Sequence, residues 1–71
     1  MKKIEVNVLV DNKDKDKLMR KMRKSKAEVI EARSISEDDS ELFSLSVNMD
    51  QKRFKKVVGS LTRMGEVTAC F

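Results

Sequence analysis

Histidine, proline, tryptophan and tyrosine are missing from this chain, and its 71 residues include only one cysteine, two glycines and three phenylalanines. Without histidine the commonest general base is missing, and the lone Cys70 has neither a disulfide partner nor a histidine to activate it. Cysteine–histidine zinc sites are excluded for the same reason, and no glycine-rich phosphate-binding motif occurs. No apolar run exceeds three residues, which rules out a membrane-spanning helix and the core of a signal peptide. We therefore expect a soluble cytoplasmic protein that is not an enzyme and holds no metal or cofactor.

Charged residues are abundant instead, at 39% of the chain, and the net charge of +4 is distributed in blocks. Residues 12–26 carry a net charge of +6, residues 27–50 carry −6, and residues 51–66 carry +4. The two positive blocks coincide with the two segments whose apolar spacing predicts helices.

Four segments show the patterns of strands. The cleanest alternation runs from Lys3 to Val10 and from Glu41 to Met49, with every second residue apolar. Ala27 to Ser36 alternates less regularly, which favours a slipped or bulged edge strand. An acidic turn at residues 37–40 precedes the third strand, and Glu66 to Phe71 forms a short last strand with Val67, Ala69 and Phe71 on one side.

Two segments have helical spacing. The first runs from about Asn12 or Lys13 to Ser25, and its short apolar stripe consists of Leu18, Met19 and Met22. The second follows Asp50, a predicted N-cap, and its stripe consists of Phe54, Val57, Val58, Leu61 and Met64. We expect Gly65 to end this helix in a left-handed conformation.

The resulting order of elements is βαββαβ. Both βαβ connections must be right-handed crossovers, and the split βαβ topology allows two of them in one small sheet. We therefore predict one α+β domain over residues 1–71. It is a ferredoxin-like βαββαβ two-layer sandwich with antiparallel sheet order 4-1-3-2 and both helices on one face. This order places the two strands with the cleanest alternation in the middle of the sheet.

From Ile4 to Phe71 the chain resembles the ACT domain family, through its element order and the stretches "VLVDNKDKDKL" and "FKKVVGSLTRMGEVTAC". The resemblance implies a non-catalytic regulatory or interaction module that binds an amino-acid-type ligand at a domain interface. The implied site is the loop of Asp11, Asn12, Lys13 and Asp14, with backbone amides for a carboxylate and side chains for an amine. The chain has lysine and aspartate where the family usually has a loop glycine, and Lys26-Ala27-Glu28 where it often has glycine and asparagine.

A small basic RNA-associated protein is the alternative, since the opening "KKIEVNVLV" is also similar to ribosomal protein S6. Its phosphate contacts would come from the basic helices, at Arg20, Lys21, Lys24, Lys52, Lys55 and Lys56. The open face of the predicted sheet lacks the stacking aromatics of an RNA-recognition motif, which counts against this alternative.

Self-association is the third expectation. The second and fourth strands are edges of the predicted sheet, and no proline protects either of them. Pairing would bury apolar area that so short a chain does not bury alone, so we expect a homodimer. The identity of a ligand, a partner or a pathway does not follow from the sequence.

Overall fold

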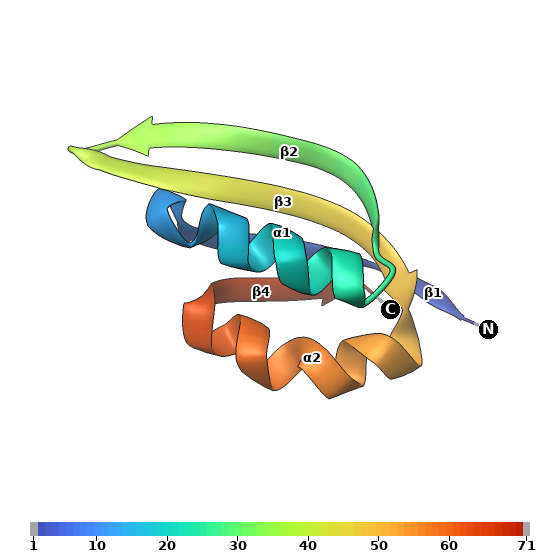
Figure 1. Cartoon of the computed structure of the whole chain (residues 1–71). Coiled ribbons are helices and arrows are strands. Elements are labelled where there is room, and N and C mark those ends of the chain that lie inside the picture. Colours follow the sequence, from blue (N-terminus) through green and yellow to red (C-terminus); the bar gives the residue numbers. More distant parts are fainter. Residues whose placement is uncertain (1, 71) are drawn as a thin grey trace.

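The computed structural model describes residues 2–70 and has both helices on one side of a four-stranded sheet (Figure 1). Its elements are β1 (Lys3–Asp11), the 3-10 turn η1 (Asn12–Asp14), α1 (Lys15–Lys24), β2 (Glu28–Glu37), β3 (Ser40–Asp50), α2 (Gln51–Met64) and β4 (Gly65–Cys70). The sheet order is β2-β3-β1-β4 and every pairing is antiparallel. The predicted ferredoxin-like sandwich is confirmed. The prediction for Phe71 lies outside the described residues.

The two central strands supply the sheet side of the core. In β1 and β3 every second side chain is buried beneath the helices, and these are Ile4, Val6, Val8, Val10, Phe43, Leu45, Val47 and Met49. The register pairs Lys3 with Asp50 at one end and Asp11 with Leu42 at the other. Because directly opposite residues point to the same face, the two alternating patterns reinforce each other.

The helices close the other side of the core. Leu18 and Met22 of α1 and Phe54 and Leu61 of α2 are buried, as the helical spacing predicts. Asp50 caps α2 through a carboxylate oxygen that accepts from the amide of Lys52 at 3.4 Å, so the predicted N-cap is confirmed. The first helix begins with the tighter turn η1 rather than as a regular α-helix.

The edge strand β2 contains the expected bulge. Val29 lies opposite Val47 and Glu31 lies opposite Ser46, so Ile30 is an extra residue between two ladder positions. The turn to β3 has only two residues, Asp38 and Asp39, with φ of 45° and 64°. Two left-handed residues are what a type I′ turn requires, and aspartate tolerates this conformation better than most residues do.

The end of α1 also contains a left-handed residue, Lys26, with φ of 56°. The amide of Ala27 donates to the carbonyl of Met22 at 3.0 Å, and that of Lys26 to the carbonyl of Arg23 at 3.1 Å. This is the Schellman pattern, in which glycine is the usual left-handed residue. Lysine in that conformation costs about 1–2 kcal/mol relative to glycine.

The prediction that Gly65 adopts a left-handed conformation is wrong. Its φ is 179°, which is extended backbone, because β4 starts immediately and pairs Gly65 with Val10. A Cβ atom at Gly65 would lie 2.1 Å from the carbonyl oxygen of Leu9. Glycine is therefore needed for the close approach of β4 to β1, and not for a turn.

We expect Gly65→Ala to lower the free energy of unfolding by at least about 3 kcal/mol, since β4 would have to move away from β1. The matched control is Gly59→Ala in α2, where a Cβ would meet nothing within 4 Å. This control should raise the free energy of unfolding by about 0.5–1 kcal/mol, because alanine favours the helix. Urea unfolding of both variants measures the two values. Equal effects of the two substitutions would contradict the packing described for β4.

Candidate functional site

The loop implied by the ACT resemblance is a closed turn at one end of the sheet. The carboxylate of Asp11 accepts a hydrogen bond from the amide of Lys13 at 3.3 Å, and the amide of Lys15 donates to the carbonyl of Asn12. Asp11 and Lys13 are exposed, whereas Asn12 and Asp14 are partly buried. The four residues lie together because they are consecutive. A ligand carboxylate that used the Lys13 amide would displace the Asp11 carboxylate.

A basic depression lies at the opposite end of the sheet, where α1 ends and β3 passes directly into α2. Its volume is about 480 Å³, and it is lined by Lys24, Ser25, Asp50, Lys52, Arg53, Lys56 and Val57. Four cationic side chains and one carboxylate therefore surround it. It also faces the first turn of α2, where the helix dipole is positive.

A second, smaller depression of about 290 Å³ lies between the helices and is lined by Lys17, Arg20, Lys21 and Met64. The six basic residues of the nucleic-acid alternative are therefore divided between two places. Lys24, Lys52 and Lys56 line the first depression, and Arg20 and Lys21 line the second, while Lys55 lines neither. Ser25 was not among the predicted site residues, because its burial depends on how α1 ends.

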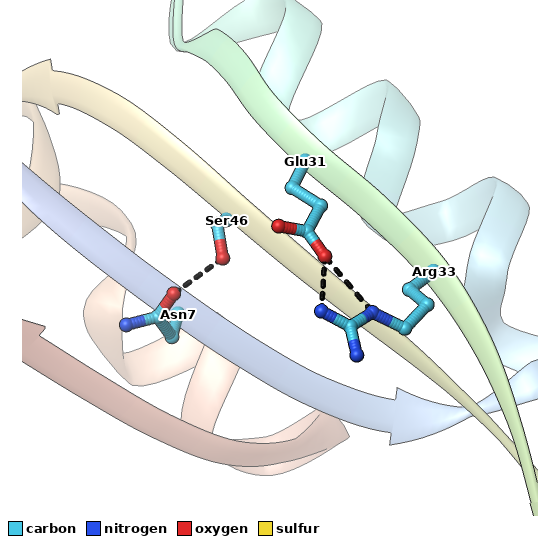
Figure 2. A network of polar contacts seen from close by, with 4 residues as sticks. All are labelled: Asn7, Glu31, Arg33 and Ser46. Carbon is cyan, nitrogen blue, oxygen red and sulfur yellow. Dashed lines mark hydrogen bonds and ion pairs between the residues drawn. The ribbon is translucent and has the colours of Figure 1, made fainter.

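The open face of the sheet carries two sets of polar contacts, between Ser46 and Asn7 and between Arg33 and Glu31 (Figure 2). Ser46 donates from Oγ to Oδ1 of Asn7 at 2.5 Å, which ties β3 to β1. Arg33 donates from Nε to Oε1 of Glu31 at 2.9 Å, and its Nη2 contacts the same oxygen. Phe43 and Phe54, the phenylalanines within residues 2–70, are both buried in the core. The described part of this face therefore offers no aromatic ring for base stacking.

Two classes of feature are missing from the described part of the chain. Within residues 2–70, histidine, cysteine, aspartate and glutamate side chains form no group of three that could hold a metal ion. Neither α1 nor α2 is long and apolar enough to cross a membrane.

Comparisons with known proteins give the fold. No protein-family model matches the sequence, and a search of curated proteins finds no significant match. The structure is similar to that of a formyltetrahydrofolate deformylase from Pseudomonas putida KT2440, with a TM-score of 0.63 and 14% sequence identity. The similarity covers 99% of this chain and 29% of the deformylase chain. At this identity the comparison shows a shared fold alone, over less than a third of the deformylase chain.

Proposed function

We propose that this chain is a non-catalytic, ACT-like regulatory or interaction module. It acts as a cytoplasmic homodimer and binds a small amino-acid-type ligand beside the interface. The fold shared with part of a larger enzyme supports the ACT-like assignment. The observation that carries the proposal is an uncovered surface on β2.

This surface is the β2 strip, defined as the side chains of β2 on the helix side of the sheet. The register places Val29, Ala32, Ser34 and Ser36 there, opposite Val47, Leu45, Phe43 and Glu41. The three apolar partners on β3 are buried, whereas all four residues of the strip are exposed, Val29 by 46%. The helical layer therefore ends at β3, and Figure 1 shows the hairpin of β2 and β3 extending beyond α1.

A second copy of the chain suits this strip better than a charged partner would. The strip contains no charged residue, because Glu28, Glu31, Arg33 and Glu37 all lie opposite the open-face positions of β3. Ile30, the extra residue of the bulge, is 49% exposed and adds apolar area at the same edge. If two β2 strands pair antiparallel, their free backbone groups are satisfied and apolar area is buried without burying a charge.

The ligand part of the proposal rests on the ACT resemblance and on the chemistry of the loop after β1. Backbone amides of η1 suit a carboxylate once the Asp11 side chain moves aside, and the carboxylates of Asp11 and Asp14 suit an amine. Asp11 pairs with Leu42 of β3, which itself pairs with Ile35 of β2. The loop therefore lies at the end of the sheet that contains the turn between β2 and β3, two strands away from the proposed interface on β2.

We expect sedimentation equilibrium to give twice the chain mass of 8.2 kDa. Ser34→Lys should shift the protein to the monomer, because it places a charge in the interface. The matched control is Thr68→Lys on β4, which is also exposed on an edge strand but lies on the open face. A monomeric wild-type protein, or equal dissociation of both variants, would contradict the β2 interface.

We also expect at least one of the twenty amino acids to raise the melting temperature of the wild-type protein in a concentration-dependent way. Saturation at about 100 times the Kd corresponds to about 2.7 kcal/mol of stabilisation. The rise should be lost in Asn12→Ala and kept in Asn48→Ala, a partly buried asparagine on the open face. If no amino acid changes the melting temperature, or both variants respond alike, the ligand assignment fails while the dimer can stand.

A further inference from the structure

We propose that the depression between the end of α1 and the start of α2 binds the phosphoryl group of a small phosphorylated ligand. The residues that would hold it, here called the anion site, are Lys24, Ser25, Lys52, Arg53 and Lys56. This function is additional to the proposed dimer and to the amino-acid loop. The anion site lies beside Asp50, which pairs with Lys3, whereas the loop lies at Asp11. Eight residue steps of β1 separate the two, which is roughly 26 Å.

Charge is the first argument for the anion site. Four cationic side chains from two helices line one depression, although the charge blocks that supply Lys24 and Lys52 lie far apart in sequence. Arginine offers a planar fork that matches two phosphate oxygens, and lysines add point charges. The positive end of the 14-residue helix α2 faces the same space.

Asp50 is the one carboxylate in the lining, and its role is local. Its side chain accepts from the amide of Lys52 at 3.4 Å and so caps α2. The amide of Gln51 is satisfied by the carbonyl of Lys2 at 2.9 Å. The carboxylate therefore offsets only part of the surrounding positive charge. An incoming phosphoryl group would meet mainly side-chain donors.

Ser25 is the second and independent argument. It is only 6% exposed, and its amide is engaged with the carbonyl of Lys21 at 3.0 Å. Its hydroxyl makes no hydrogen bond within residues 2–70. Within that range, every fully buried side-chain nitrogen or oxygen has a hydrogen-bond partner. Because the Ser25 hydroxyl has none, it is not fully buried and remains accessible to solvent. Since Ser25 lines the depression, its hydroxyl is available as a donor to a ligand bound there.

Size and surroundings favour a small ligand over an RNA strand. A volume of about 480 Å³ falls within the range of about 300–1,000 Å³ that is usual for small-molecule sites. The four cations line one recess, and the described open face has no aromatic ring for bases. The second depression has three cations but no buried hydroxyl in its lining, which makes it a natural control.

Nuclear magnetic resonance titration of the 15N-labelled protein with inorganic phosphate and with pyrophosphate tests the proposal, with ionic strength held constant by sodium chloride. We expect saturable shifts centred on the amides of Ser25, Lys52 and Arg53. The double variant Arg53→Gln/Lys56→Gln should weaken pyrophosphate binding about tenfold or more, as expected for lost charge-assisted hydrogen bonds. Ser25→Ala keeps the charge and should still weaken binding severalfold, which a purely electrostatic surface would not show.

The matched control is Lys17→Gln/Arg20→Gln, which removes the same charge from the second depression and should leave binding unchanged. If the first double variant does not give a folded spectrum, Lys24→Gln/Lys52→Gln replaces it with the same expectation. Shifts that do not saturate, or equal weakening by the two charge-matched pairs, would overturn the proposal. So would a saturable response to an oligoribonucleotide but not to pyrophosphate, which would indicate an RNA surface. Sedimentation equilibrium of the same proteins tests the β2 interface separately. A wild-type protein that is dimeric but does not bind pyrophosphate contradicts the anion site and leaves the β2 interface intact.

Discussion

The double pairing of β1, with β3 on one edge and β4 on the other, is the constraint on which the rest of the structure depends. Four β-branched side chains of β1 (Ile4, Val6, Val8 and Val10) are at most 3% exposed, so this one strand contributes a third of the buried apolar core. Burying one such side chain is worth about 1.5–3 kcal/mol. The side chains of β1 share one core cluster with those of both helices, and β2 lies at the edge because it pairs with β3 alone.

That arrangement leaves three surfaces with different chemistry. The β2 strip beyond β3 contains no charged residue and is uncovered, since two short helices do not span four strands. The end of the sheet at Asp11 has a turn rich in carboxylates and amides. The opposite end joins the C-terminus of α1 to the N-terminus of α2, which concentrates cations around a buried serine. In the functions proposed above, the first surface serves self-association, and the other two would bind small charged molecules at two separate places.

The fold could be predicted from the sequence because its strongest signals are local. The alternation in β1 and β3, the cap at Asp50 and the helical spacing after it all agree with one topology. The conformation of Gly65 was predicted wrongly because a glycine after a helix usually marks a left-handed cap. Here the close approach to Leu9 requires the glycine, and Leu9 lies 56 residues earlier in the chain. The bulge was foreseen from the broken alternation of β2, but the extent to which the helices leave β2 exposed was not.

The candidate sites were less predictable for a related reason. The basic residues were visible in the sequence, but their division into two depressions depends on how α1 and α2 lie together. Ser25 has no distinctive sequence pattern, and its burial follows from the Schellman end of α1 at Lys26. Sites that form where two elements meet depend on tertiary geometry, whereas capping and alternation do not.

Residue-resolved hydrogen exchange under native conditions tests the double pairing of β1 most directly. If β1 is paired on both edges, the amides of residues 5–10 should all exchange only through global unfolding, at one common free energy. If alternate amides of this segment exchange through small local openings, β1 is paired on one edge only, and the account of the core and of its sites is wrong.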